Sequence, residues 1–180
     1  MSTAMSLTQE YPAAPAEVYA LFTHSDFLQA RMEAGGGIDP KVVSIAGTDG
    51  AAGAENTADP AGDLAAGATI VTQQAIPASV LPSMVASMMA GDPVTERTET
   101  WRADGEGYVA DFSIVVKGAP ASLKGTMRLA PSASGSTLTV EGTANVPIPM
   151  FGPKLENVIA EQITTVLGTE GEYTRSRLGA

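Results

Sequence analysis

The residues with the most suggestive spacing for chemistry lie at positions 94–103, VTERTETWRA. Trp101 is the sole tryptophan, and we expect it on the buried face of a strand. Since strand side chains alternate between two faces, Glu99, Arg97 and Thr95 would share that face. An arginine–carboxylate pair that faces a cavity could orient the polar group of a ligand. With Tyr108 it could also carry out acid–base catalysis.

The same pair has a simpler interpretation. Burying two charges is costly unless they are paired or hydrated. A strand near the edge of a sheet has two partly wet faces, and there Arg97 and Glu99 would form an ordinary surface contact. The pattern favours this surface contact and leaves the interior pair as the alternative.

A second candidate is the segment 80–93, VLPSMVASMMAGDP, which holds three of the eight methionines. A short helix here would place on one side the residues Met84, Val85, Met88 and Met89. Methionine is flexible and polarisable, so it adapts to ligands of varied shape. We therefore expect residues 80–92 to form a flap over an apolar cavity. The alternative is that these side chains fill the core between strands, and the lack of charge between Asp63 and Asp92 agrees with both.

Several other kinds of site are disfavoured. The chain has no cysteine, which excludes disulfides and thiolate metal ligands. Its one histidine, His24, leaves no pair for zinc and is expected at the surface or at a helix cap. The acids of residues 48–66, a Gly/Ala/Asp-rich stretch that we expect to be flexible, lack the spacing of a calcium loop. The sequence therefore predicts no metal and no cofactor.

Charge and hydropathy limit the partners. The net charge of −10 repels phosphate backbones, so nucleic acid is not an expected partner. The first residues, MSTAMSLTQEY, lack the features of a signal peptide. No run reaches the ~18 apolar residues that a bilayer span requires. These observations predict a cytoplasmic protein with no integral membrane association.

The elements expected around these candidates come in blocks: one strand and two short helices, then a run of strands, then one long helix. A period-two strand over 5–11 precedes two short helices, the first beginning at Pro15 and the second at Asp26, where Gln29 would complete a capping box. Strands are then expected over 41–46, 67–76, 94–103, 107–117, 122–130 and 136–146. A long amphipathic helix over 151–178 closes the chain, with Gly168 and Gly171 weakening its last third.

This order predicts an α+β fold in a single domain over 1–180. A curved antiparallel sheet of about six to seven strands would wrap around the long C-terminal helix, with the two short helices at one end. A helix laid across a curved sheet tends to leave a gap, and we expect that gap to be the cavity. The side chains expected to line it, besides those named above, are Phe112, Met127, Phe151, Leu155, Ile159 and Ile163. Plain core packing would explain most of them as well.

Two stretches carry a resemblance to known proteins. The opening EYPAAPAEVYALFTHSDFLQARMEA and the closing VPIPMFGPKLENVIAEQITTVLGTEGEYTRSRL resemble the first strand with its helix pair and the last helix of the START-like helix-grip superfamily (SRPBCC). That superfamily includes the birch-pollen allergen and the aromatic polyketide cyclases. The closing stretch most resembles a bacterial family, domain of unknown function 2505. The resemblance implies a deep hydrophobic cavity and transfers no catalytic residue.

We expect from these observations a protein that binds or transports a hydrophobic small molecule or lipid, as a monomer or weak homodimer. One alternative is a cyclase- or hydratase-like enzyme that uses Arg97, Glu99 and Tyr108, although the sequence offers little support for catalysis. A second alternative is an interaction module that docks a partner without any ligand.

Overall fold

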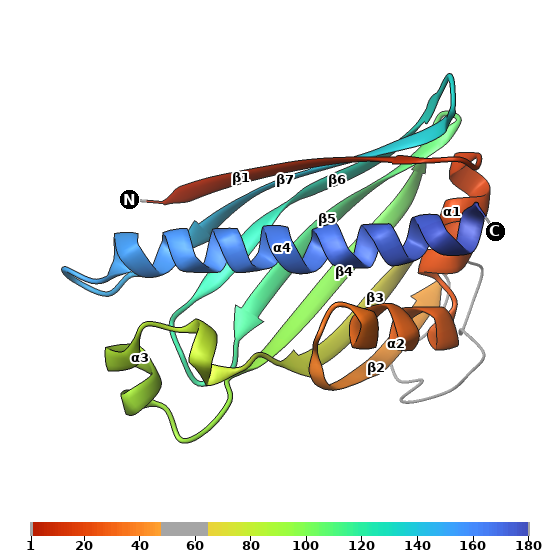
Figure 1. The fold of residues 1–180 in the computed structure, drawn as a ribbon. Coiled ribbons are helices and arrows are strands. Elements are labelled where there is room, and N and C mark those ends of the chain that lie inside the picture. Colours follow the sequence, from red (N-terminus) through yellow and green to blue (C-terminus); the bar gives the residue numbers. More distant parts are fainter. Residues whose placement is uncertain (1, 48–64, 180) are drawn as a thin grey trace.

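The structure is a computed structural model that describes residues 2–47 and 65–179, with Met88 described by its backbone alone. Its centre is a seven-stranded sheet of order β1-β7-β6-β5-β4-β3-β2 (Figure 1). The strands are β1 (Thr3–Tyr11), β2 (Ile38–Gly47), β3 (Gly67–Ala75), β4 (Val94–Asp104), β5 (Gly107–Val116), β6 (Ser122–Ser132) and β7 (Gly135–Asn145). All neighbouring pairs are antiparallel. β2 to β7 follow in chain order, and β1 closes the edge beside β7.

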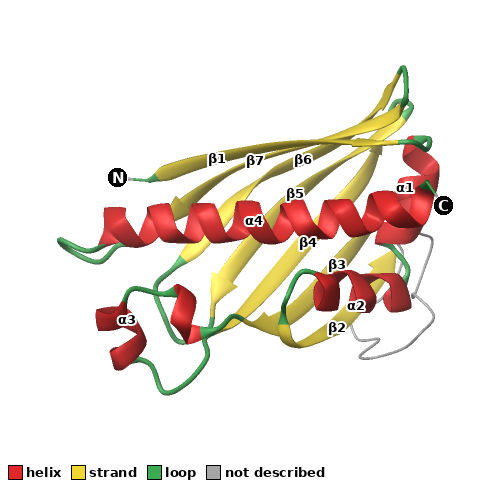
Figure 2. Cartoon of the chain, in the orientation of Figure 1, coloured by secondary structure: helices red, strands yellow, loops and turns green. Residues whose placement is uncertain are grey.

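The helices lie on one side of this sheet (Figure 2). They are α1 (Pro15–Phe22), α2 (Ser25–Ala34), α3 (Ser83–Met88) and α4 (Gly152–Leu178), with a short 3-10 turn, η1 (Ala78–Val80), before α3. α4 crosses the inner face of the sheet, while α1 and α2 sit near its C-terminal end (Figure 1). The predicted α+β helix-grip architecture is confirmed, and its strands and helices lie within a few residues of the expected ranges.

Local chemistry explains where the two short helices begin. Pro15 occupies the first turn of α1, and the Glu17 carboxylate accepts the N–H of Ala14 at 3.1 Å. α2 begins at Ser25 with His24 as its N-cap, whose carbonyl accepts the Leu28 N–H at 3.0 Å. The predicted capping box with Asp26 at the N-cap is therefore wrong, because the N-cap lies two residues earlier. Asp26 lies in the first turn, where its charge favours the positive end of the helix dipole.

α4 is continuous from Gly152 to Leu178, so the expected weakening at its glycines does not interrupt it. Gly171 is needed there because β1 approaches the helix closely. A Cβ at position 171 would collide with the side-chain amide of Gln9. That amide donates from Nε2 to the Leu167 carbonyl at 2.9 Å, which ties β1 to the helix.

The core lies between the inner face of the sheet and the helices. α4 packs closely along β1 and β7 and against α2. The inner face carries large buried side chains from every strand. Over β3 to β6 the sheet packs less closely against α4, because a pocket separates the two. One half of the sheet is thus covered by direct packing, and the other half is not.

Two expectations need a separate statement. The predicted flexible loop 48–66 lies outside the described residues except for its last two positions. Among the described helices, none combines the length and apolar composition that crossing a bilayer would require.

Candidate functional site

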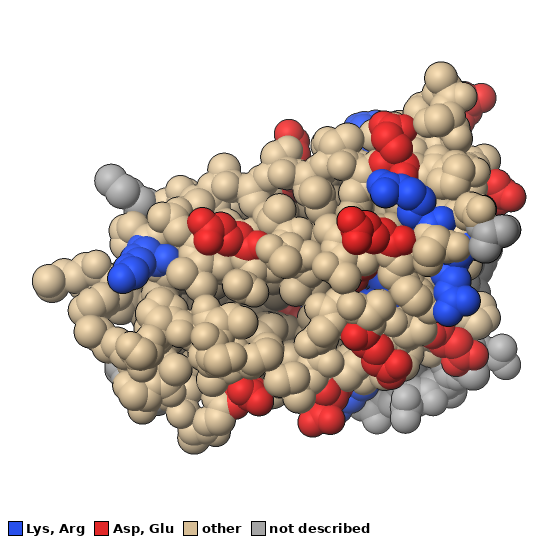
Figure 3. All heavy atoms as spheres, in the orientation of Figure 1, with Lys and Arg blue, Asp and Glu red and all other residues tan. Residues whose placement is uncertain are grey.

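A pocket of about 240 Å³ lies between α4 and the inner faces of β3 to β6, and we name it the central pocket. Figure 3 shows the surface hollowed beside α4, between the α3 end of the molecule and α2. The wall is mainly apolar. It is formed by Met32, Gly35, Gly36, Gly37, Thr72, Gln74, Ile76, Pro77, Val80, Leu81, Thr95, Arg97, Ile114, Val116, Ser122, Leu123, Val158, Ile159, Gln162, Ile163, Thr165, Val166 and Leu167.

The connector between β3 and β4 covers one side of this pocket. Its first residues, Ile76 to Leu81, form that wall. Two hydrogen bonds from backbone N–H groups hold the connector in place. Ile76 N–H donates to the Pro93 carbonyl at 3.0 Å, and Ala78 N–H donates to the Asp92 carboxylate at 2.8 Å. The connector contacts the pocket through its first residues, and Met84 and Met89 do not line the pocket.

At the inner wall of the pocket, β4 contributes Arg97, which begins a group of four buried charges that we name the ion cluster: Arg31, Arg97, Glu99 and Glu170. Arg97 Nη1 and Nη2 each donate to Glu170 Oε2 at 3.1 Å, and Arg97 Nε lies 3.2 Å from Glu99 Oε1. Arg31 Nε lies 3.6 Å from the same Glu170 oxygen. Trp101 Nε1 donates to Glu99 Oε2 at 2.8 Å. Three separate elements, α2, β4 and α4, are joined by these contacts.

The ion cluster corrects the simpler interpretation of the β4 pattern. Arg97 is only 8 % exposed and Glu99 only 4 %, so they form no surface contact. β4 is the third strand from the β2 edge, and its inward face is dry. Burial would lower the pKa of Arg97, but the nearby Glu170 and Glu99 carboxylates raise it overall. Arg97 therefore stays charged, and two arginines balance two glutamates.

A second, smaller cavity of about 20 Å³ lies on the far side of the ion cluster, among residues that include Gln9, Tyr11, Glu99 and Glu170. It has the volume of a single water molecule, since about 10–15 Å³ suffices for one. Tyr11 donates its hydroxyl proton to Gln9 Oε1 at 2.8 Å. Burial of this ring raises the pKa of Tyr11 to about 12. The ion cluster thus closes the inner end of the central pocket with polar groups.

The residues expected to bind a ligand lie in several separate parts of the structure. Arg97, Ile159 and Ile163 line the central pocket. Glu99, Trp101 and Met127 line the small cavity, and Phe112 and Leu155 are buried in the core outside both. Met84, at 56 % exposure, and Phe151 lie at the surface, and Val85 and Met89 are half-buried outside the pocket wall; the side chain of Met88 lies outside the described part.

Met84 and Met89 lie away from the pocket because α3 is short and follows η1 at an angle that carries it to the end of the molecule (Figure 1). The Pro-rich start of the connector takes the place that we assigned to them. The predicted role of Met84, Val85, Met89 and Phe151 as ligand contacts has no support from this arrangement.

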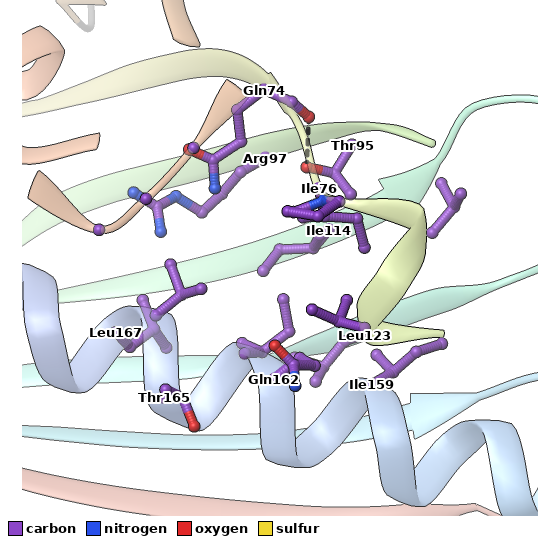
Figure 4. A pocket seen from close by; sticks show the side chains of 18 of the residues that line it. Gln74, Ile76, Thr95, Arg97, Ile114, Leu123, Ile159, Gln162, Thr165 and Leu167 are labelled. Carbon is purple, nitrogen blue, oxygen red and sulfur yellow. Dashed lines mark hydrogen bonds between the residues drawn. The ribbon is translucent and has the colours of Figure 1, made fainter. Parts of the chain in front are cut away.

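The sequence interpretation missed the partners of Arg97. Glu170 lies on the apolar stripe of α4, seven residues after Ile163, so a charged residue on that stripe was the available signal. Arg31 gave no such signal, because it sits near the end of a short helix where a basic residue is common. Gln74 also lines the pocket, beside Arg97 (Figure 4). His24 is exposed, as expected.

Comparison with known proteins adds the following. The model of a family described as protein of unknown function (DUF2505) matches residues 6–178. An uncharacterised protein of Mycobacterium bovis is 29 % identical over 178 residues, which cover 97 % of this chain and 95 % of the relative. Neither description states an activity.

Solved structures resemble the fold at low sequence identity. A START superfamily protein from Mycobacterium smegmatis aligns with a TM-score of 0.52 and 10 % identity, over 99 % of this chain and 97 % of that one. The di-domain ARO/CYC protein StfQ from the steffimycin biosynthetic pathway aligns with a TM-score of 0.55 and 9 % identity, over 100 % of this chain and 53 % of that one. At these identities the likeness shows a shared fold and specifies neither a ligand nor a reaction.

Proposed function

The chain belongs to the family of proteins of unknown function DUF2505, and from this premise we propose that it binds a small, mainly apolar molecule in the central pocket. The observation that carries the proposal is the pocket itself, an apolar space of about 240 Å³ inside an otherwise packed interior. Protein interiors are packed about as densely as organic crystals, and voids larger than a water molecule are few. A void of this size is unfavourable for stability, so a binding role is its best explanation.

The volume limits the ligand. Pockets for small molecules commonly measure about 300–1,000 Å³, and an engineered cavity of about 150 Å³ already admits benzene. At about 240 Å³ the central pocket suits a molecule of one or two rings or a short chain. A complete two-chain lipid would need the connector to move. Among the lipid-like ligands expected from the sequence, we favour the smallest.

Titration with naphthalene, a two-ring hydrocarbon, tests this proposal. Ile163, on the pocket wall of α4, would be changed to Trp so that the indole occupies the void, with Glu161→Trp on the exposed side of the same helix as the matched control. We expect the unmodified protein and the control to bind, and Ile163→Trp to lose binding by tenfold or more. Equal binding by both variants, or no binding by the unmodified protein, would refute the proposal.

A catalytic role is the second candidate, since Arg97 reaches the pocket and is joined to two carboxylates. Tyr108, the third residue considered for catalysis, does not join them. Its ring stacks on Tyr19 at 3.9 Å between centroids, and it lies outside the pocket wall. Mass spectrometry of a bound, reactive carbonyl compound before and after incubation separates the two roles. A product with an altered mass or an altered chromatographic retention would support catalysis, and recovery of the unchanged compound would support binding alone.

The interaction-module alternative depends on exposed apolar side chains. Met150, at 92 % exposure, and Phe151 stand at the turn before α4, and Met84 is exposed on α3. Sedimentation velocity would reveal self-association through these residues. The cytoplasmic location and the monomeric or weakly dimeric state stay predictions.

A further inference from the structure

Arg97 has hydrogen-bonding capacity that the protein does not use. A guanidinium carries five N–H groups. Nη1 and Nη2 each give one to Glu170 Oε2, and Nε faces Glu99. Each terminal nitrogen retains a second N–H, and no further acceptor contacts them within the described residues. Because Arg97 lines the central pocket, these N–H groups are available to a ligand.

Gln74 places a second donor beside them. In the β3–β4 register Thr72 pairs with Arg97 and Gln74 pairs with Thr95, so Gln74 and Arg97 are diagonal neighbours on the inner face. The Gln74 Oε1 atom is buried without a hydrogen-bond partner and lies against Gly37, where a Cβ would collide with it. The amide nitrogen is turned the other way, next to Arg97 (Figure 4). Two donors thus lie side by side with no acceptor between them.

Charge decides which kind of acceptor fits. Arg97 is the only titratable side chain in the described wall of the pocket, and its charge is already balanced, because the ion cluster contains two arginines and two glutamates. A bound carboxylate would add a buried negative charge without a countercharge, which is unfavourable. A neutral carbonyl oxygen accepts from both donors and adds neither a charge nor a proton of its own.

Resting on the proposed function, we infer that the ligand is an uncharged carbonyl compound, a ketone, aldehyde or ester, whose oxygen accepts hydrogen bonds from Arg97 and Gln74. Its apolar part occupies the space between the connector and the α4 side chains Ile159 and Ile163. The polar end of the pocket is thereby specific for an acceptor, while the apolar end tolerates varied shapes.

Three probes with one ring system test this inference: naphthalene, 2-acetylnaphthalene and 2-naphthoate. Isothermal titration calorimetry at neutral pH, where the acid is ionised, measures each Kd. A hydrogen bond from a charged donor makes the ketone bind roughly tenfold tighter than the hydrocarbon. The naphthoate should bind more weakly than the ketone.

Two neighbouring glutamines on opposite faces of β3 supply the matched variants. Gln74→Leu removes a donor from the pocket. Gln73→Leu removes a side chain that lies away from the pocket and donates a hydrogen bond of 2.7 Å to the Glu96 carboxylate. We expect Gln74→Leu to reduce the ratio of ketone affinity to naphthalene affinity several-fold, and Gln73→Leu to leave this ratio and both affinities unchanged. Arg97→Lys, which retains the charge and loses the planar donor pair, should reduce the preference further.

The outcomes separate this inference from the proposed function. If none of the three probes binds, the proposed function fails and this inference with it. If naphthalene binds but the ketone binds no tighter, or the naphthoate binds tightest, the pocket stands and the carbonyl specificity is overturned. A rise in ketone affinity in Gln74→Leu would mean that Gln74 itself occupies the Arg97 donors, and would also overturn it.

Discussion

The central pocket and the ion cluster lie next to each other on the same strand and under the same helix, yet one is a void and the other is filled. On β4 the inward positions 95 and 97 face the pocket, and the next two, 99 and 101, face the cluster. Over the pocket α4 presents Ile159 and Ile163. About two turns further along, it presents Glu170, which reaches Arg97 at 3.1 Å. The difference depends on what the helix places opposite the strand.

This difference assigns stability mainly to the ion cluster and ligand binding mainly to the pocket. The ion cluster joins α2, β4 and α4 and leaves little space, so its loss should lower stability. The pocket contributes few contacts, so changes in its wall should alter binding more than stability. Arg97 belongs to both regions, which makes the boundary between them testable.

The largest effect is expected from Glu170→Ala in the ion cluster. The change leaves Arg31 and Arg97 buried without their shared carboxylate, and breaking a buried pair in this way costs about 3–5 kcal/mol. Urea unfolding followed by Trp101 fluorescence measures the loss in the free energy of unfolding. Glu172→Ala, two positions away and exposed on α4, is the control and should change it by less than about 0.5 kcal/mol.

A loss below about 1 kcal/mol in Glu170→Ala would contradict the contrast. Such a result would mean that water reaches the arginines once the carboxylate is removed, and that the ion cluster is not shielded from solvent.

The next largest effect compares two apolar truncations. Leu129 is 1 % exposed and lies outside both cavities, so Leu129→Ala should cost about 2–5 kcal/mol. Ile163→Ala only enlarges a space that already exists, and its cost should be about 1 kcal/mol, near the transfer term alone. Equal losses in denaturant unfolding would show that the pocket wall is as tightly packed as the core.

Alkaline pH should lower the free energy of unfolding through Tyr11, which lies beside the ion cluster. The pKa of Tyr11 is raised from 10.0 to about 12 by burial, so the folded state retains a proton that the unfolded state loses first. Its contribution to stability is therefore complete below pH 10 and is lost as the pH rises through about 12. The total is about 2–3 kcal/mol. Unfolding across this pH range measures it.

Tyr11→Phe should flatten that alkaline decline, although it also removes the bond to Gln9. A decline of unchanged size in Tyr11→Phe would mean that another group carries it.

The smallest expected effect compares two glycines. An added Cβ meets Gln9 at position 171 and Gln74 at position 37. Gln9 is held by bonds to Leu167 and Tyr11, so Gly171→Ala overpacks a fixed group, at about 1–3 kcal/mol less about 1 kcal/mol of helix propensity gained. Gln74 borders the pocket and can move, so Gly37→Ala should cost less than about 0.5 kcal/mol. Thermal unfolding of both variants measures the two losses of stability. A larger loss for Gly37→Ala than for Gly171→Ala would contradict this prediction.

Most of the fold could be predicted from periodicity. The period-two strands and the long amphipathic helix appear within a few residues of their expected ranges, because alternation and helical spacing are local properties. The face shared by Arg97, Glu99 and Trp101 followed from the same rule. The preference for a surface contact was wrong, because the charge of Glu170 on the apolar stripe of α4 does not indicate which strand it reaches.

The candidate site was predicted less completely. Composition suggested methionines as the contacts of the connector with a cavity, whereas Ile76 and Leu81 line the central pocket. A chain segment can be recognised as apolar from its residues; which of its side chains turn inward depends on the direction in which it leaves the sheet.

By itself, the sequence determined the class of fold, the sharing of one β4 face by charged and aromatic side chains, and the apolar stripe of α4. Only the tertiary structure decided where α4 separates from the sheet, which partners neutralise Arg97 and which donors face the pocket. Arg97 and Glu170 are 73 residues apart, and their contact depends on sheet curvature, helix position and the close approach at Gly171 together. Periodicity constrains a residue relative to its neighbours in the chain, whereas packing constrains it relative to all elements at once.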